Sequence, residues 1–523
     1  MKPPSDQAAI ESGSAATPCA KAAEPWILVV TILGSSMAFI DSTVVNVALP
    51  AIQRSLGGTV INLQWVVEGY GLLLSALILT GGALGDAFGR KRMFLTGVTV
   101  FAMASVGCGL AANIRGLVIA RAVQGFGAAF LVPGSLSIIS ASFSESKRGP
   151  AIGTWSGFTS ITAAAGPVLG GWLIENASWR WAFFLNVPLA LAVIVLSFWR
   201  VPESKAEAKG HVDWFGALLV TAGLTGVTYG FIESSSRGWT NASVWGALAV
   251  GGAFLIAFRC FEAHTSFPMV PFDLFRSSNF AGANLLTLFL YAALGIFLFL
   301  FPLNLIQIQH YSATAAGAAA LPLILLMFLL SRWSGGLVAR FGAKSPLVVG
   351  PIVAAIGFLI FVFPSVRGSY WTTFFPGFVV LGLGMAISVA PLTTVVMNAV
   401  DQRLAGTASG INNAVARVAA LLAIAVLGMV MVGLFSHYLN ERLTVLGLPI
   451  DLRHAVQSNE IRLAAVTVPG GLDSITAANL RSSIDQGFVF GFRLTMLICV
   501  GLSIASSGFA WRMIGADANP AHS

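Results

Sequence analysis

Residues 280–305 read FAGANLLTLFLYAALGIFLFLFPLNL, an apolar run without a single charged side chain. A helix needs about 20 apolar residues to cross the roughly 30 Å hydrocarbon layer of a membrane, and this segment is long enough. Comparable runs recur along the whole chain, whereas a β-barrel would show short segments of alternating polarity. The predicted fold class is therefore all-α, a polytopic membrane helical bundle.

Composition supports this prediction. The chain has 523 residues, of which 56% are hydrophobic and 10% are charged, and its mean hydropathy is +0.83. A soluble domain carries about 25% charged residues, so a lipid environment fits better than water. The net charge is +8, but the basic residues lie between apolar runs and form no single patch, so nucleic acid is not expected as a partner. The scattered cysteines and histidines indicate neither a metal site nor a cofactor.

Fourteen segments are long and apolar enough to be membrane spans. They lie near residues 26–50, 63–84, 93–113, 117–142, 151–174, 181–199, 214–232, 243–260, 280–305, 313–333, 346–365, 371–396, 405–435 and 488–511. If the amino terminus is cytoplasmic, most of the 29 basic residues fall on the cytoplasmic side. The short outer loops then hold only a few, which are Arg54, Arg115, Arg180, Arg237 and Arg367. Since short cytoplasmic loops are enriched in Lys and Arg, we expect a multi-pass protein with both termini in the cytoplasm.

An internal repeat indicates two related halves. Residues 82–91 (GALGDAFGRK) and 335–344 (GGLVARFGAK) align without a gap and share Gly, Leu, Phe, Gly and Lys. Membrane transporters are often built from duplicated bundles, so we predict two six-helix pseudo-repeats with two extra central helices. The expected divisions are a cytoplasmic tail at 1–25, a first bundle at 26–200, the extra helices and their loops at 201–278, a second bundle at 279–513 and a tail at 514–523. The second bundle includes an outer loop at 436–486, for which short amphipathic helices and a disordered tether both stay open.

A few ionisable side chains lie at membrane depth, where each costs a few kcal/mol on insertion scales. At 1.5 Å of rise per residue, Asp41 lies roughly 13 Å from the outer end of its span, and Glu68 and Arg121 lie roughly 8–9 Å from theirs. Apolar surroundings disfavour an ionised carboxylate, whereas a nearby arginine favours it. A carboxyl group balanced between these influences can load and release a proton, so Asp41 is the first candidate for proton coupling and Glu68 the second, with Arg121 balancing the charge. The alternative is a fixed salt bridge from either acid to Arg121 that only holds helices together.

Other polar groups in the spans are candidates for the lining of a substrate cavity. They are Asn46, Gln124, Asn412 and Arg417. Arg417 has no acid near it in the sequence, so it can either neutralise an anionic substrate or donate to backbone carbonyls. In residues 166–171 (GPVLGG), a proline removes one backbone donor, and the glycines permit close contact with a neighbouring helix.

Five segments together resemble the major facilitator superfamily, in its fourteen-span drug/proton antiporter branch of EmrB/QacA type. They are residues 41–50 (DSTVVNVALP), 82–92 (GALGDAFGRKR), 121–127 (RAVQGFG), 153–171 and 179–188 (WRWAFFLNVP). The resemblance implies a cytoplasmic gating motif, a span-four motif tied to proton coupling, and a span-five antiporter motif. The gating residues would be Gly82, Asp86, Gly89, Arg90 and Lys91, and the antiporter residues Gly166, Pro167, Gly170 and Gly171. Two positions depart from the pattern, because Thr162 replaces the usual glycine and Ala339 replaces the acid in the second copy of the gating motif.

The function expected from these residues and this resemblance is proton-coupled export of small lipophilic or cationic compounds across a bacterial inner membrane, by alternating access. This would be multidrug efflux by a monomer, with protons, a small-molecule substrate and the lipid bilayer as partners; a periplasmic adaptor protein is left open. The alternatives are an exporter of one metabolite or siderophore and, from other classes, a non-transporting membrane sensor or a membrane enzyme. The sequence has no clustered catalytic set and no phosphate-binding G-x-x-x-x-G-K-[ST] loop, which argues against an enzyme and against ATP-driven transport.

Overall fold

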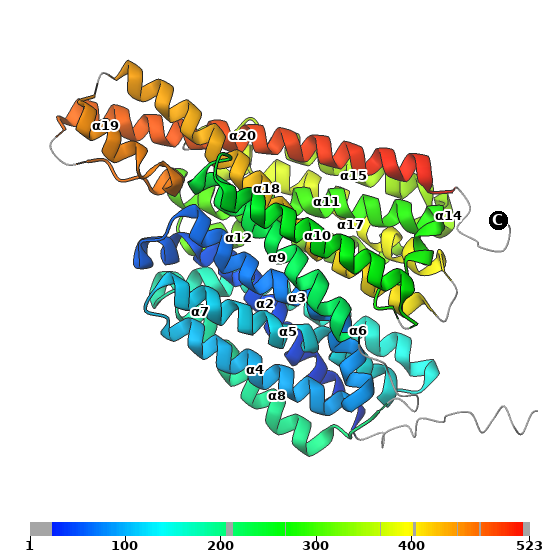
Figure 1. Ribbon diagram of the computed structural model, residues 1–523. Coiled ribbons are helices and arrows are strands. Elements are labelled where there is room, and N and C mark those ends of the chain that lie inside the picture. Colours follow the sequence, from blue (N-terminus) through cyan, green and yellow to red (C-terminus); the bar gives the residue numbers. More distant parts are fainter. Residues whose placement is uncertain are drawn as a thin grey trace, which may run out of the picture.

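The computed structural model describes residues 23–205, 213–266, 268–366, 368–400, 404–446, 448–469 and 472–515. The expected cytoplasmic tails, 1–25 and 514–523, lie almost entirely outside these ranges. The described chain consists of helices that run side by side in one elongated bundle (Figure 1). Within these ranges, 13 helices are long and apolar enough to cross a membrane.

The one remaining predicted span, near 346–365, corresponds to the short apolar helix α15 (Lys344–Ile360). It has 17 residues, which gives about 25 Å at 1.5 Å per residue and matches the lower limit of about 17 residues for a span. It packs against α17 (Phe375–Asn398) and α20 (Ser474–Met513). The prediction of a fourteen-span helical fold is therefore confirmed.

The first half of the chain forms a bundle around α5. Its helices are α2 (Glu24–Leu56), α3 (Val60–Phe88), α4 (Arg90–Leu110), α5 (Ile114–Ser142), α6 (Glu145–Asn176), α7 (Trp181–Phe184) and α8 (Asn186–Arg200). Helix α5 contacts α2, α3 and α4 along much of its length. Glycine makes this possible, because a Cβ on Gly127 would lie 2.7 Å from the backbone nitrogen of Phe101 on α4.

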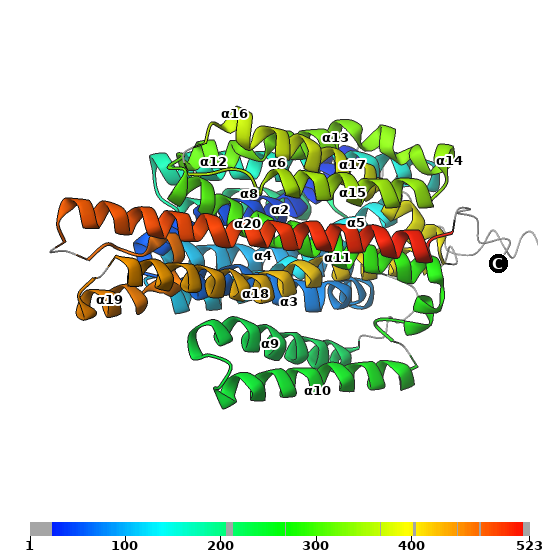
Figure 2. The same ribbon diagram turned by 90° about the horizontal axis from the view of Figure 1, so that it is seen from above.

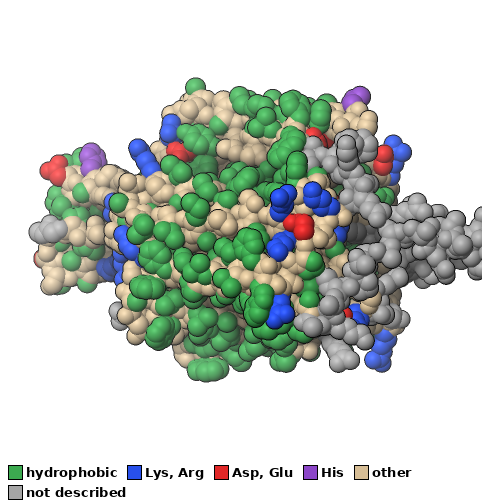
Figure 3. Space-filling view, turned by 90° about the horizontal axis from the view of Figure 1, so that it is seen from below, with side chains coloured by type: hydrophobic (Ala, Val, Ile, Leu, Met, Phe, Trp, Pro, Cys, Tyr) green, Lys and Arg blue, Asp and Glu red, His purple; other side chains and the backbone are tan. Residues whose placement is uncertain are grey.

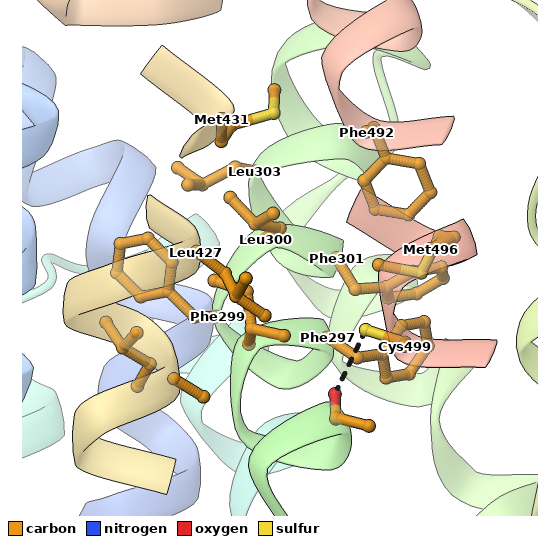
Figure 4. Close-up of a cluster of buried hydrophobic side chains, with 14 of the residues drawn as sticks. Phe297, Phe299, Leu300, Phe301, Leu303, Leu427, Met431, Phe492, Met496 and Cys499 are labelled. Carbon is orange, nitrogen blue, oxygen red and sulfur yellow. Dashed lines mark hydrogen bonds between the residues drawn. The ribbon is translucent and has the colours of Figure 1, made fainter. Parts of the chain in front are cut away.

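The second half forms a similar bundle around α11. Its helices are η1 (Phe272–Arg276), α11 (Ser278–Leu303), η2 (Asn304–Ile308), α12 (Ala313–Ala319), α13 (Leu321–Gly335), α14 (Leu337–Phe341), α15, α16 (Tyr370–Thr373), α17, α18 (Ala405–Val445), α19 (Ile450–Gln457), η4 (Glu460–Ala465) and α20. Its interior is apolar. Figure 4 shows Phe297 and Leu300 of α11 close to Leu427 of α18 and Met496 of α20. Of the buried charged residues in the described chain, this half contributes only Asp485, on α20.

The two extra helices, α9 (Trp214–Arg237) and α10 (Ala242–His264), form a hairpin on the outside of the bundle (Figure 2). Helix α9 contacts α3 of the first half and α18 of the second half. The hairpin therefore lies along the seam where the two halves meet.

The bundle has two distinct ends. We call the end where α2 begins and α20 ends the terminal end. The opposite end, where α18 ends and α20 begins, is called the hairpin end. At the hairpin end, α18 and α20 project beyond the other helices (Figure 2). With 41 and 40 residues, they are about 60 Å long, longer than the 40–45 Å of a whole bilayer.

This projection contains the segment 436–486, which is expected from the sequence to be an outer loop. Its two ends are continuations of α18 and α20, and the short helices α19 and η4 lie between them. Val456, Leu463 and Ile484 are buried in a small core there. Of the two possibilities left open, the described residues form helices rather than a tether.

The outer surface suits a lipid environment. Large apolar side chains such as Met103 and Phe198 are each 71% exposed. In Figure 3, hydrophobic side chains cover much of the middle of the face, and charged side chains gather toward the two ends. This distribution is that of a membrane-embedded body with polar caps.

The repeat read from the sequence has a structural counterpart. Gly89 joins α3 to α4, and Gly342 joins α14 to α15, both at the terminal end. Their φ angles are 114° and 74°, in the region that residues with a Cβ rarely adopt. The two aligned glycines thus make equivalent turns in the two halves.

Candidate functional site

Asp41 lies near the middle of α2, because the helix continues past Pro50 to Leu56. Three side chains donate hydrogen bonds to its carboxylate: Arg121 Nη1 at 2.5 Å, Gln124 Nε2 at 2.7 Å and Asn186 Nδ2 at 3.3 Å. Asp41 is fully buried. Both carboxylate oxygens of Asp41 are therefore hydrogen-bonded in the interior of the first half.

Arg121 of α5 is the counter-ion of Asp41 and is 1% exposed. Its Nε donates to the carbonyl oxygen of Val66 at 3.0 Å, and its Nη1 also donates to Gln124 Oε1 at 2.8 Å. The guanidinium carbon lies 4.2 Å from the ring centroid of Tyr70, a cation–π contact. Arginine suits this place because its planar fork can satisfy several acceptors at once.

The same network reaches two further helices. Gln124 Nε2 and Asn186 Nδ2 both donate to Ser105 Oγ, at 2.8 and 3.2 Å. These contacts join α2, α4, α5 and α8 around one carboxylate. Removing one member of a buried ion pair costs about 3–5 kcal/mol because it leaves the other charge uncompensated, so loss of either Asp41 or Arg121 alone is expected to destabilise the first half.

Glu68 has the opposite environment. It is 1% exposed, and neither of its carboxylate oxygens has a hydrogen-bond partner among the described residues. An ionised carboxylate buried without a partner is costly, whereas the neutral acid costs far less. The two predicted acids are thus distinguished by their partners: three donors reach Asp41 and none reaches Glu68.

Glu68 lines a cavity of about 150 Å³ between the two halves. Most of the wall is apolar, and α2, α3, α5 and α18 all contribute. The lining residues are Ser42, Val45, Asn46, Val67, Glu68, Tyr70, Gly71, Leu74, Ser75, Arg121, Arg417, Ala420, Leu421 and Ile424. Asp41 is absent from this wall and lies behind Arg121, so Glu68 is the acid that the cavity contents can reach.

The predicted cavity residues fall into two groups. Asn46 and Arg417 line the cavity. Gln124 instead belongs to the Asp41 network, and Asn412 of α18 donates to Asn284 Oδ1 at 3.1 Å and Thr287 Oγ1 at 2.7 Å on α11. Arg417 has no ion-pair partner within the described part of the chain, which leaves its charge available to the cavity.

The gating residues lie together at the terminal end. Arg90 pairs with Asp86 at 2.8 Å, Lys91 Nζ lies 5.6 Å from the ring centroid of Phe198, and Gly82 faces Pro133. Glu203, just after α8, accepts hydrogen bonds from the backbone nitrogens of Lys91 and Arg92 at 3.0 and 3.1 Å. Its negative charge at the amino terminus of α4 is favourable for the helix dipole. The recorded side-chain contacts of this motif are within the first half.

The antiporter residues lie where α6 meets two other helices. A Cβ on Gly166 or Gly170 would come within 2.5 Å of Thr43 or Val44 of α2. A Cβ on Gly171 would lie 2.3 Å from the carbonyl oxygen of Ala313, at the start of α12. Although Pro167 lies within it, α6 is continuous from Glu145 to Asn176. The motif thus packs α6 tightly against its own bundle and against the other half.

Direct side-chain hydrogen bonds between the two bundles are found toward the hairpin end, for the residues the structure describes. Gln307 Nε2 donates to Gln53 Oε1 at 2.8 Å, and Thr314 Oγ1 bonds Glu175 Oε2 at 2.5 Å. One turn into α3, Gln64 Nε2 donates to the carbonyl oxygen of Ile424 at 2.8 Å. In this conformation the bundles are therefore joined on the hairpin side of the cavity.

Several members of the site were not predicted as functional. Asn186 occurs in the quoted segment 179–188, but its contact with Asp41 depends on the fold. Ser105, Tyr70 and Gln64 carry no sequence signal, since each is a common residue in an apolar run. The spatial arrangement alone identifies them.

Comparisons with known proteins place this architecture in a family. The family model described as Major Facilitator Superfamily matches residues 31–424. The chain belongs to the major facilitator superfamily of membrane transporters. It is not an enzyme, and the resemblance proposed from the sequence is confirmed.

Its relatives are resistance and export proteins. The chain is 33% identical over 508 residues to the multidrug resistance protein Stp of Mycobacterium tuberculosis, covering 95% of this chain and 93% of that protein. It is 31% identical to the tetracenomycin C resistance and export protein of Streptomyces glaucescens, covering 95% and 94% of the two chains. It is also 32% identical to a methylenomycin A resistance protein of Bacillus subtilis, covering 77% and 87%. The chain is thus a multi-pass membrane protein of a bacterial drug-resistance exporter family.

Solved structures support the fold. A bacterial homologue of the human lysosomal transporter Spinster, in an inward-facing unoccupied conformation, superimposes with a TM-score of 0.62 at 17% identity, covering 94% of this chain and 98% of that one. At this level of identity the likeness concerns the fold alone.

Proposed function

We propose that this protein is a proton-coupled antiporter that exports small lipophilic cations by alternating access. The observation that carries the proposal is the carboxyl group of Glu68, which lines the cavity between the two halves and has no hydrogen-bond partner among the residues that the structure describes. The drug-resistance relatives support export as the direction of transport.

The geometry favours Glu68, ahead of Asp41, as the group that exchanges its proton for substrate. Without a partner, Glu68 is stable in this conformation as the neutral acid. A lipophilic cation entering the cavity supplies the missing positive charge, so the carboxyl releases its proton and binds the cation. A proton and a cation thus compete for one acid, which is the exchange that antiport requires.

Asp41 has a different role in this proposal. Arg121, Gln124 and Asn186 all donate to it, so both of its oxygens are engaged within the first half. We assign to the Asp41–Arg121 pair the task of joining α2 to α5 and of holding Arg121 at the cavity wall. This reverses the order of the two acids expected from the sequence.

Alternating access is consistent with the contacts between the halves. In the described conformation, Gln53 and Glu175 accept hydrogen bonds from the second half and Gln64 donates one to it, which joins the two bundles on the hairpin side. Access to Glu68 would then come from the terminal end. Because basic residues such as Arg90, Lys91 and Arg92 lie at that end, we assign it, and both termini, to the cytoplasm by the positive-inside rule.

Transport into proteoliposomes tests the proposal. The purified protein is reconstituted, a pH gradient is imposed, and accumulation of the lipophilic cation ethidium is followed by fluorescence. Wild type is expected to accumulate ethidium only with the gradient, and Glu68→Gln is expected to lose this accumulation. Glu441→Gln is the matched control, because the Glu441 side chain is 69% exposed outside the cavity. Equal gradient-driven accumulation by wild type and Glu68→Gln would refute the proposal.

Arg417 favours a second candidate, an exporter of one anionic or zwitterionic metabolite. It lines the same cavity, and the described residues include no acid paired with it. Arg417→Gln separates the candidates, since export of a cation would be kept or increased, whereas export of a carboxylate would be lost.

A further inference from the structure

We infer that Gln64 is the positioning residue that transmits the protonation state of Glu68 to the contact between the two halves, by rotation of its side-chain amide. This inference rests on the proposed function and adds to it a coupling residue that the exchange of proton for cation alone does not specify.

Gln64 lies across the seam between the bundles. It is fully buried on α3, and its Nε2 donates to the carbonyl oxygen of Ile424 on α18 at 2.8 Å. The orientation of the amide follows from this partner, because a carbonyl oxygen can only accept. The amide also fits against Gly428, where an added Cβ would lie 1.9 Å from Nε2.

The other end of the same amide is unused. Gln64 Oε1 is buried and has no hydrogen-bond partner within the described residues. Glu68 follows four residues later on α3, so the two side chains are neighbours on one face of the helix, and its carboxylate oxygens are unpartnered as well. Two buried polar groups that each need a partner are therefore one helical turn apart.

Proton chemistry decides how these two groups can pair. A protonated Glu68 has an O–H that can donate to Gln64 Oε1, and this arrangement keeps Nε2 directed at Ile424. An ionised Glu68 can only accept, so it pairs with Gln64 only if the amide turns and offers Nε2. After that rotation Oε1 faces the Ile424 carbonyl oxygen, and two acceptors cannot bond. Loss of the proton thus removes a hydrogen bond between the two halves.

Other polar and charged groups near Glu68 could pair with its carboxylate in place of Gln64. Tyr70 on α3, Arg121 on α5 and Arg417 on α18 line the same cavity, and α2 contributes Ser42 and Asn46. Arg121 is already bonded to Asp41 and stacked on Tyr70. Helices α4 and α9 also pack on α3 but contribute no residue to this lining. Arg417 is therefore the rival partner for an ionised Glu68.

Spin-label distances between the halves test the inference. Labels at Arg115→Cys and Val445→Cys report on the hairpin end from α5 and α18, in protein with Cys19 and Cys260 replaced by Ser, and the distance distribution is measured in nanodiscs from mildly acidic to mildly alkaline pH. In the wild-type background, the distance between the two labels is expected to lengthen at alkaline pH. Glu68→Gln is expected to stay short at every pH, because its amide can donate to Gln64 Oε1 as the protonated acid does.

Changes at the seam complete the test. Gln64→Leu is expected to lose the pH-dependent shift, and Gly428→Ala to give long distances at every pH because its Cβ displaces the amide. Gly433→Ala on the same helix is the matched control and should behave as wild type, since nothing lies within 4 Å of its added Cβ. The role of Gln64 would be overturned if Gln64→Leu showed a normal pH-dependent shift in distance while Glu68→Gln or Arg417→Gln lost that shift. The proposed function would then still stand. A normal shift in Glu68→Gln would overturn the inference and count against the proposed function as well.

Discussion

Replacing Asp41 by Asn removes one charge from the buried network and turns one of the two acceptor oxygens into an NH2 donor. The side chain keeps its size, but Arg121 loses its counter-ion while its own side chain stays 1% exposed. Arg121 keeps its bonds to the Val66 carbonyl oxygen and to Gln124, and its contact with Tyr70. The perturbation therefore leaves a buried guanidinium without its counter-ion and leaves at least one donor to residue 41 without an acceptor.

The expected loss of stability follows from the burial of the pair. Removing one partner of a buried salt bridge costs about 3–5 kcal/mol. The remaining acceptors of Arg121 place the loss at the lower end, about 3 kcal/mol by the same measure. Asp86→Asn is the matched control, because Asp86 and Arg90 also form an ion pair, at 2.8 Å, but are 38% and 20% exposed. An exposed pair contributes about 0–1 kcal/mol.

The assay is thermal unfolding of the purified proteins in one detergent, with a double-mutant cycle of Asp41→Asn and Arg121→Gln. Asp41→Asn should lower the Tm far more than Asp86→Asn does. The double variant should lose less than the sum of the two single variants, because it leaves no unpaired charge. Equal Tm values for Asp41→Asn and Asp86→Asn, or strict additivity in the cycle, would refute the assigned role of the pair.

Two further predictions concern packing and pH. Gly171→Ala should reduce transport strongly, because its Cβ would lie 2.3 Å from the Ala313 carbonyl oxygen. Gly153→Ala on the same helix should transport normally, because nothing lies within 4 Å of its added Cβ. Equal transport rates of the two variants in proteoliposomes would contradict this prediction. In η4, between the projecting ends of α18 and α20, burial raises the pKa of Glu460 above 4.5. Hydrogen bonds from Ser436 and Asn440 lower this pKa but do not cancel the rise. A raised pKa means that folding favours the protonated form of Glu460. Its contribution to stability is therefore complete below the pKa of the unfolded chain and is lost as the pH rises through the raised pKa of the folded protein. Glu460→Gln should therefore be more stable than wild type at neutral pH, by at most about 1 kcal/mol for a half-exposed group, and thermal unfolding should show the difference closing toward pH 4.5.

The sequence predicted most of the fold because its strongest signals are local. Apolar length identified the spans, and α15, with 17 residues, is shorter than each of the 13 candidate spans of the described chain. Helix ends were less predictable, since α18 and α20 continue into water, where polar residues such as Asn440 and Gln486 end the apolar pattern without ending the helix.

The site was only partly predictable. Charge at membrane depth identified Asp41, Glu68 and Arg121, because such residues are rare in apolar segments. Which acid pairs with Arg121 could not be read from the chain, since the geometry depends on how α2, α3 and α5 pack. Gln64 and Ser105 gave no signal for the same reason: their importance comes from neighbours far away in sequence, Ile424 and Gln124.

The most direct test of the central claim is proton release on substrate binding. Ethidium is added to purified protein in weakly buffered detergent solution, and a pH-indicator dye reports the protons released while ethidium fluorescence reports binding. If Glu68 exchanges its proton for the cation, wild type should release about one proton for each cation bound, and Glu68→Gln should release none. Full proton release by Glu68→Gln, or cation binding by wild type without any release, would contradict the claim.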